Sequence, residues 1–534
     1  MFRNSAPSLL FLNMVTPSCG GTKPAYSRSL TTKGANARNV MNVTRSVVPN
    51  QISTGNVAMT TIGFVALAAK WFWDTQMSDS SFTREALSRV GEIETALRTS
   101  NEIISAGLVT TEEAAASAAS KFKEGDVDVL VACCFMWSED QPLFKILDVF
   151  DDVPLLLWCW TPGTTLPKTL SAVDLIKWSG PVGAQQTSGA LRRSGREFKF
   201  VLGSHTERET LREVDSFARA AAVAKSLKHL KIGLLPYRYV VMTNTWTDEF
   251  SLMSELGIDV IHISVAELAS SSATVKNEEV KAYIRDLKGM QISGDVRSEG
   301  LRHAVRVSLG LAKIVEKLNL SAISVSDAND ELHAVLKCRP CLYLPSVFER
   351  GVVVSSEGDL MGTVAQLFLT RLSGEPTIFT EIFTYDESKN EILVGHAGMA
   401  DIRLAESRSA VTVTKDYEYP KETAGVWMSF SIKPGPVTLL SIANTKNAFH
   451  LVVAKGQALR AKGKLQGYPC GLIRLDTPLR SFFQRSTGVG TTQHWAVAPG
   501  DHVKAISNLA RVLGVDCTIL NKVQFQFPCC EIAQ

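Results

Sequence analysis

The sequence predicts an α/β protein with two Rossmann-like, doubly wound domains followed by a C-terminal antiparallel, β-barrel-like domain. Up to about residue 372, apolar runs typical of strands alternate with helical segments, and this alternation favours parallel sheets covered on both faces. After that point, short β-rich runs are separated by Gly, Pro and Asn, as in antiparallel sheets and barrels. A chain of 534 residues is too long to fold around one hydrophobic core, so several domains are expected. Its content of 45% hydrophobic and 20% charged residues is typical of globular proteins.

The first domain is predicted over residues 56–228. A helical period covers residues 82–98, and a longer helix is expected over 207–227, where an Ala-rich face could bridge two domains. The strand-like runs of this domain are 58–66, 127–135, 153–160 and 198–203. We expect the boundary near Lys228.

The second domain is predicted over residues 229–372. Its strand-like runs are 231–236, 258–264, 322–325 and 352–355. The last run leads directly into Glu357, Gly358 and Asp359, and a helix then continues to Leu372. A carboxylate at the carboxyl end of a parallel strand lies where open α/β sheets bind ligands, so Glu357 is a candidate site residue.

The third domain is predicted over residues 373–534. It closes with a helix over 502–513 that Gly514 caps, and His502 is expected to start this helix rather than to act in a site. Its strand-like runs are 377–385, 409–414, 428–432 and 450–454.

Residues 1–55 have the composition of an organelle transit peptide. They contain six Lys or Arg side chains and many Ser, Thr and Asn, and the first acidic residue is Asp74. We therefore expect import into a mitochondrion or plastid; a merely disordered tail is the alternative, with a cytoplasmic location otherwise. Without the six charges the net charge of +3 becomes −3. No Lys/Arg cluster in the rest of the chain stands out from the acids around it, so no nucleic-acid partner is indicated. No run of about 18 apolar residues indicates a membrane span.

The ten cysteines are scattered, which fits a reducing compartment. Only Cys338 and Cys341, separated by Arg339 and Pro340, have the spacing of a zinc or redox motif. No second Cys or His pair at ribbon spacing accompanies them, so two buried thiols beside a loop proline is the favoured interpretation.

Three segments place ionisable side chains among apolar or Gly-rich neighbours: one around Glu357, one around Glu381 with His396, and one around His494. Burying an isolated charge costs several kcal/mol, so such groups are usually paired, metal-bound or catalytic. Composition alone does not choose among these outcomes.

The order of these segments resembles the L-fucose isomerase and L-arabinose isomerase group. The motifs that carry the resemblance are Ser356-Glu357-Gly358-Asp359-Leu360-Met361-Gly362, Glu381, His396-Ala397-Gly398, Lys433-Pro434-Gly435-Pro436-Val437-Thr438, Gln493-His494 and Gly500-Asp501-His502. Each motif alone is weak, and their shared order and spacing are fairly specific. The resemblance extends from about Asn56 to the C-terminal helix.

The resemblance implies a metal site formed by Glu357, Glu381 and His494. His396 is a fourth candidate, either as a metal ligand or as a histidine lining the substrate cavity, and Asp359 is expected to cap and orient its loop. Fucose isomerases have Asp at the second ligand position, whereas this chain has Glu, as arabinose isomerases do. The resemblance therefore leaves the sugar open.

The implied activity is aldose–ketose isomerisation of a free deoxyhexose or pentose. A proton leaves one of the first two sugar carbons, an enediolate forms, and the proton returns to the neighbouring carbon. Two carboxylates and an imidazole favour Mn²⁺, or another divalent cation, over Zn²⁺. Glu357 and Glu381 can also serve as the catalytic base and acid, and the sequence does not assign the two roles.

The substrate contacts implied by the resemblance are Gln493 and, more loosely, Trp427 and Tyr468. Trp137 lies where the first domain of the family reaches into the active site of a neighbouring subunit; an aromatic residue anchoring a loop is the alternative. With this placement the resemblance implies a homotrimer or homohexamer.

Two other functions remain open at this stage. The same metal site could run another enediolate reaction on a modified sugar. Paired Rossmann-like domains also occur in non-catalytic sugar-binding proteins, although a binder has no need of a metal-bearing triad.

Overall fold

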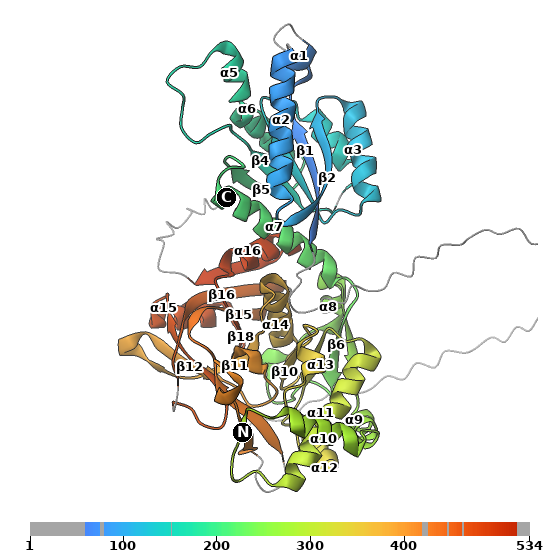
Figure 1. The fold of residues 1–534 in the computed structure, drawn as a ribbon, viewed down its shortest axis with the longest axis vertical. Coiled ribbons are helices and arrows are strands. Elements are labelled where there is room, and N and C mark those ends of the chain that lie inside the picture. Colours follow the sequence, from blue (N-terminus) through green and yellow to red (C-terminus); the bar gives the residue numbers. More distant parts are fainter. Residues whose placement is uncertain are drawn as a thin grey trace, which may run out of the picture. The chain divides into compact units, whose positions relative to one another are not determined.

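The computed structural model describes residues 59–74, 80–150, 152–418, 425–445, 448–461 and 464–520 (Figure 1). The predicted transit peptide, residues 1–55, lies outside the described residues and stays a prediction. In the part of the chain that is described, no helix combines the length and the apolar character needed to cross a membrane.

The first sheet is parallel and has the strand order β2-β1-β3-β4-β5. Alternate residues of β1 contribute to two hydrophobic clusters: Ile62 and Phe64 to one, and Val65 and Leu67 to the other. Both faces of this sheet are therefore covered, as predicted. The strands are β1 (Thr60–Leu67), β2 (Asn101–Val109), β3 (Val129–Cys134), β4 (Leu155–Cys159) and β5 (Lys199–Leu202). The helices are α1 (Lys70–Asp74), α2 (Ser80–Leu97), α3 (Glu112–Glu124), α4 (Gln141–Leu147), α5 (Ala172–Lys177), α6 (Gly180–Arg193) and α7 (Arg208–Leu227).

Strand β2 was not predicted from the sequence. Its burial is uneven, and polar residues such as Glu102 and Ser105 interrupt the apolar pattern. An outer strand with one neighbour needs fewer buried side chains than a central one, so its signal is weak.

The second sheet is also parallel, with the order β10-β9-β6-β7. Its strands are β6 (Leu230–Leu235), β7 (Ile258–His262), β9 (Ala322–Val325) and β10 (Val353–Ser356). The helices that follow β6, β7, β9 and β10 are α8 (Glu249–Leu256), α9 (Val265–Ala273), α10 (Asn277–Asp286), α11 (Ser298–Leu318), α12 (Asp330–Leu336), α13 (Pro345–Phe348) and α14 (Leu360–Ser373).

The third sheet is mixed rather than purely antiparallel, which corrects the prediction. Hydrogen bonding passes through β16, β15, β18, β11, β12 and β17 and returns to β16, and each of these pairings is antiparallel. Parallel pairs β16–β19, β14–β17 and β8–β13 extend the sheet outward. The strands are β8 (Gln291–Ile292), β11 (Ile378–Asp386), β12 (Glu391–Gly395), β13 (Thr412–Lys415), β14 (Val426–Ser431), β15 (Gly435–Thr445), β16 (Ala448–Leu459), β17 (Pro469–Leu475), β18 (His494–Pro499) and β19 (Asp516–Leu520).

Two further helices belong to this region of the chain: α15 (Leu479–Val489) and α16 (Val503–Leu513). His502 is the residue before α16 and Gly514 caps its end, both as predicted. Lys504 of α16 pairs with Glu209 and Glu213 of α7, so α16 lies along α7 (Figure 1). The predicted domain boundaries stay predictions, and the β8–β13 pairing crosses one of them.

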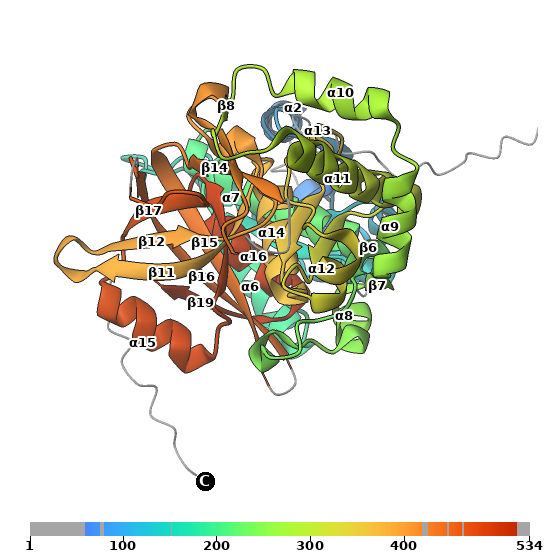
Figure 2. The same ribbon diagram turned by 90° about the horizontal axis from the view of Figure 1, so that it is seen from below.

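Helix α14 joins the second and third sheets. One hydrophobic cluster contains Ile232 of β6, Phe368 of α14 and Leu440 of β15, so the two sheets share a continuous core. The β11–β12 hairpin of the third sheet can be followed in Figure 2. Because α14 is held on both sides, its N-terminal turn is a fixed platform for the residues that precede it.

Gly362, in the first turn of α14, is tightly enclosed. A β-carbon at this position would lie 2.4 Å from Cε2 of Phe379 and 2.9 Å from Oδ2 of Asp359. Gly362→Ala should therefore lower the thermal unfolding midpoint, at a cost of about 1–3 kcal/mol, because the overpacked ring and carboxylate must move.

Gly91→Ala is the matched control, since Gly91 lies inside α2 with open space around its Cα. It should be neutral or stabilising by about 0.5–1 kcal/mol, as alanine is the better helix former. Equal effects of the two substitutions, measured by calorimetry, would contradict the tight packing around α14.

Candidate metal centre

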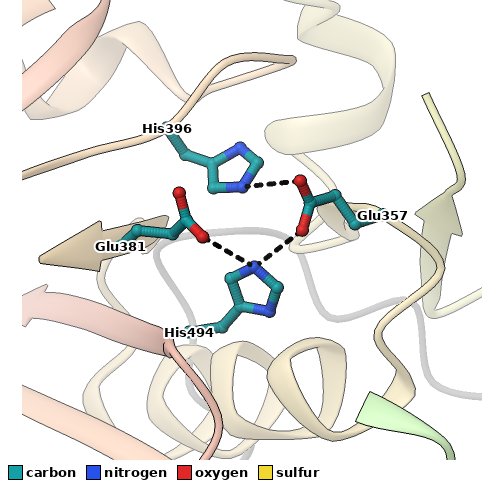
Figure 3. Close-up of side chains that lie close together, drawn as sticks. All are labelled: Glu357, Glu381, His396 and His494. Atoms are coloured by element: carbon teal, nitrogen blue, oxygen red, sulfur yellow. Dashed lines mark ion pairs between the residues drawn. The ribbon is translucent and has the colours of Figure 1, made fainter. Parts of the chain in front are cut away.

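Four predicted residues meet at one point in the structure. Glu357, Glu381, His396 and His494 each offer one ligand atom, and these atoms lie within 4.8 Å of one another (Figure 3). The residues come from the end of β10, from β11, from the loop after β12 and from the start of β18. The four residues are separated by up to 137 positions in the chain, and only the folded sheets bring them together.

The register of the third sheet accounts for three of the four positions. Glu381 on β11 pairs with His494 on β18 and with Gly395 on β12, and His396 follows Gly395 directly. Residues opposite one another on neighbouring strands hold their side chains close together. The sheet therefore places Glu381 and His494 side by side on adjacent strands and brings His396 to them at the end of β12.

Glu357 reaches the same point from the second sheet, through an unusual backbone conformation. Its φ is 63°, in the left-handed region that a non-glycine residue occupies at a cost of about 1–2 kcal/mol. Gly358 follows at φ 65°, and the chain then enters α14. The sharp turn directs the Glu357 carboxylate to the two histidines: Oε2 lies 3.0 Å from Nε2 of His494, and Oε1 lies 3.8 Å from Nε2 of His396.

The ring of His494 is fixed by Asp359. Its Nδ1 lies 2.7 Å from Oδ2 of Asp359, and both side chains are fully buried. The other oxygen of Asp359 accepts hydrogen bonds from the backbone N–H groups of Met361 and Gly362 and so caps α14. The predicted capping role of Asp359 is confirmed. A carboxylate on one ring nitrogen leaves the other, Nε2, to face a ligand.

His396 is oriented in a similar way by the backbone. Its Nδ1 lies 2.6 Å from the carbonyl oxygen of Ala397, a contact in which the nitrogen carries the proton and donates. Its Nε2 is therefore left with a lone pair. Phe379 packs beside both imidazoles, with ring centroids 4.9 Å from His396 and 4.4 Å from His494.

The charges of the site influence one another. Burial acts to lower the pKa of His494, but Asp359 and Glu357 outweigh it and raise that pKa to about 9. Burial acts to raise the pKa of Glu357, but the hydrogen bond with His494 and the electrostatic influence of His396, His494 and Arg339 outweigh it and lower that pKa below its usual value. Without a cation, therefore, the site holds a proton on His494 beside an ionised Glu357.

The donor set fits a divalent cation. Oε2 of Glu357, Nε2 of His396 and Nε2 of His494 are all buried. The first and the last form an ion pair at 3.0 Å, and Nε2 of His396 has no hydrogen-bond partner among the described residues. Buried polar atoms are rarely left unpaired, and these three converge with a carboxylate oxygen of Glu381. Two carboxylates with two imidazoles suit Mn²⁺ or a similar ion. Their assignment as ligands stays a prediction.

Three of the predicted substrate contacts lie around this group. Gln493 precedes His494, and its amide contacts Asn244 at 2.8 Å and the sulfur of Met242 at 3.2 Å, both in the loop after β6. Trp427 is fully buried and packs against Ala397, and Tyr468 lies 5.1 Å from the Trp427 ring. Contact of these residues with a sugar stays a prediction.

Trp137 is not part of the group. It follows β3 of the first sheet, and its ring contacts Trp71 at 5.6 Å and Phe72 at 6.0 Å. These contacts match the alternative of an aromatic residue anchoring a loop, and the predicted contact with a neighbouring subunit stays a prediction.

Asp327 and Arg339 are the residues near the site that were not predicted. Oδ1 of Asp327 accepts a hydrogen bond from the backbone N–H of Glu357, and Oδ2 accepts one from Arg339. Asp327 follows the predicted strand at 322–325, so its place at a carboxyl strand end was an available signal. Cys338 and Cys341, which flank Arg339, are free and buried, and burial raises the pKa of Cys338 to about 12. Reactive or metal-binding cysteines have lowered pKa values, so the interpretation as buried thiols holds.

The raised pKa of His494 makes the stability of the metal-free protein depend on pH. The folded value of about 9 lies above the ordinary 6.5, so the protonated ring stabilises the fold fully below pH 6.5. This contribution, up to about 3 kcal/mol, is lost as pH rises through 9. Urea unfolding with a chelator between pH 6 and 9.5 should show the decline.

Asp359→Asn should flatten that pH dependence, because the carboxylate that holds the imidazolium is gone while the side chain keeps its size and an oxygen for the helix cap. If the free energy of unfolding depends on pH equally in the wild type and in Asp359→Asn, His494 is not the group responsible.

No protein-family model matches the chain, but individual proteins do. A sulfoquinovose isomerase from Priestia aryabhattai is 22% identical over 413 residues, which cover 77% of this chain and 90% of the relative. A sulfoquinovose isomerase from Alkalicoccus urumqiensis is 23% identical, covering 62% of this chain and 74% of the relative. An L-arabinose isomerase from Bacillus licheniformis is 20% identical, covering 62% and 68%.

Among solved structures, a periplasmic sugar-binding protein from Legionella pneumophila aligns at 10% identity over 58% of this chain and 94% of that chain. Its TM-score of 0.14 is too low to support a conclusion. The relatives support the sugar isomerase class and not L-fucose isomerase specifically. This chain is an enzyme related to the sulfoquinovose and L-arabinose isomerases.

Proposed function

We propose that this protein is a metal-dependent aldose–ketose isomerase that acts on a free sugar through an enediolate. The observation that carries the proposal is the meeting of two carboxylates and two imidazoles, whose ligand atoms lie within 4.8 Å of one another and three of which are buried. The sugar isomerase relatives support the same chemistry.

Glu357, Glu381 and His494 would hold the divalent cation, with His396 as the fourth ligand. When bound, Mn²⁺ or a similar ion acts as a Lewis acid that stabilises negative charge on the sugar oxygens. Asp359 keeps the proton of His494 on Nδ1, and the Ala397 carbonyl does the same for His396. Both rings therefore present Nε2 to the site without reorganisation.

The two glutamates also provide for proton transfer. They lie on either side of Nε2 of His494, with carboxylate oxygens 3.0 Å and 3.7 Å away (Figure 3). Glu381 is 28% exposed and Glu357 15%, so solvent reaches both while His494 is closed off. One carboxylate accepts a proton from a sugar carbon while the other carboxyl group donates a proton to a sugar oxygen. The two roles exchange in the reverse direction.

We propose a pentose or deoxyhexose as the substrate, and a modified sugar as the second candidate. The relatives named for L-arabinose favour the first, and those named for sulfoquinovose favour the second. Arg339, which is linked to Glu357 through Asp327, is already paired with three carboxylates. The charge of Arg339 is therefore already balanced within the protein and is not offered to an anionic sugar.

We also propose a homotrimer or homohexamer in which Trp137 approaches the site of a neighbouring subunit. The proposal rests on the resemblance to the isomerase group and on the exposure of Trp137, which is 38% accessible. Import into a mitochondrion or plastid, proposed from residues 1–55, accompanies it.

The activity is tested with the purified protein, Mn²⁺ and a panel that includes L-arabinose, L-fucose and sulfoquinovose. We expect conversion of at least one sugar to its ketose, lost with a chelator and restored by Mn²⁺. Glu357→Gln should lower kcat by about 10²–10⁴-fold, because a proton-transfer group and an anionic ligand are removed together. Glu387→Gln, an exposed glutamate between β11 and β12, is the control and should leave kcat unchanged.

Metal binding without turnover of any sugar in the panel would reject the isomerase and leave a metal-bearing sugar binder. Full activity of Glu357→Gln would remove Glu357 from the mechanism.

Metal affinity should rise with pH, because His494 must lose its proton before its Nε2 binds a cation. With a pKa of about 9 in the metal-free protein, we expect the Mn²⁺ association constant to rise about tenfold per pH unit between 6.5 and 8.5. Calorimetric titrations in two buffers of different ionisation enthalpy should show about one proton released per ion. An affinity independent of pH would exclude His494 as a ligand.

A further inference from the structure

A buried charge network lies next to the proposed metal site. Arg339 is 2% exposed and donates hydrogen bonds to three carboxylates. Nε and Nη2 bind Asp416 at 3.0 and 2.8 Å, and Nη1 binds Asp327 and Glu418, each at 3.0 Å. The guanidinium also lies 4.9 Å from the ring of Trp427. Contacts on several sides fix the position of Arg339.

This network reaches the site through one hydrogen bond. Oδ1 of Asp327 accepts from the backbone N–H of Glu357 at 3.0 Å, and the Glu357 carbonyl accepts from the N–H of Tyr239 at 3.2 Å. Both polar groups of the Glu357 backbone are thus held, one from the loop after β9 and the other from the loop after β6. A left-handed backbone at a non-glycine residue persists only where its surroundings enforce it.

We propose that Asp327, held in place by Arg339, is a positioning residue that locks the left-handed backbone of Glu357 and so aims its carboxylate at His494 and His396. Asp327 suits this role because its two oxygens serve two donors, the Glu357 N–H and Arg339. The inference rests on the proposed metal site and adds residues that neither the sequence motifs nor the relatives assign.

The loop that carries His396 is supported from the same side. Ser356 donates to the carbonyl of Ala397 at 3.3 Å, and Ala397 packs in one cluster with Trp427 and Cys341. Since Trp427 covers Arg339, the network supports both the turn at Glu357 and the loop at His396. The short Cys338–Cys341 segment therefore has a use that is neither metal binding nor redox chemistry: it places Arg339.

A purely structural role is the competing explanation, and a matched pair of substitutions separates the two. In Asp327→Asn the amide offers one acceptor oxygen, so either Glu357 N–H or Arg339 must face an NH₂ group. Asp416→Asn makes the same change on the same arginine, in an equally buried residue, but Asp416 makes no hydrogen bond to Glu357 in the described structure.

The test measures Mn²⁺ affinity by calorimetric titration of the metal-free full chain, together with the thermal unfolding midpoint. Asp327→Asn should bind Mn²⁺ about 10–100-fold more weakly than the wild type, as removal of a residue that orients a ligand does. The Mn²⁺ affinity of Asp416→Asn should stay within about threefold of the wild-type value, even when its thermal unfolding midpoint falls as far as that of Asp327→Asn. With Mn²⁺ saturating, Asp327→Asn should still lower kcat more than it raises KM.

Arg339→Lys is the second variant, to be used if Asp327→Asn fails to fold. Lysine keeps the charge but lacks the Nη1 group that donates to Asp327, so Mn²⁺ affinity should again fall by about tenfold or more.

Wild-type affinity in Asp327→Asn, or an equal loss in Asp416→Asn, would overturn the positioning role while the metal site stands. No Mn²⁺ binding by the wild type would overturn the proposed function and this inference with it.

Discussion

The carboxylate of Asp359 connects the parts of the structure that form the site. One oxygen caps α14, and the other holds the ring of His494. The helix belongs to the second sheet and His494 begins β18 of the third sheet, so a single buried side chain fixes the two sheets at the point where they meet. Because α14 packs into the core shared by both sheets, this contact has little freedom to move.

Two different structural features position the four candidate ligands. Strand pairing in the third sheet supplies Glu381, His494 and His396, since β11 lies between β18 and β12. A left-handed turn at the end of β10 supplies Glu357. The strand pairing is regular and needs only the correct register. The left-handed turn needs support from outside the strand. Asp327 binds the N–H of Glu357, and Tyr239 binds its carbonyl oxygen.

Charge balance explains why such a site is stable in the fold but incomplete by itself. Asp359 and Glu357 hold a proton on His494, and Arg339 compensates Asp327 and its neighbours. Nε2 of His396 is buried and has no hydrogen-bond partner among the described residues. A bound cation would give the four ligand residues a common partner. His494 must lose its Nε2 proton before it binds the cation.

Much of the architecture could be predicted from local patterns. The strand at 322–325 and the helix ending at Leu513 agree with the structure, because an apolar run or a glycine cap is a local signal. Strand β2 escaped prediction because polar residues interrupt it. The mixed pairing of the third sheet escaped prediction because strand partners are chosen by contacts between distant segments, such as β8 with β13.

The sequence by itself determined which residue types could carry the chemistry: Glu357, Glu381, His396 and His494 stand out as ionisable groups in apolar or glycine-rich surroundings. Only the tertiary structure decided that their ligand atoms converge, that Glu357 adopts a left-handed backbone, and that Arg339 supports it through Asp327. The physical reason is that a residue's type and neighbours are local properties. The direction of its side chain, and the partner of its backbone N–H, depend on segments far away in the chain.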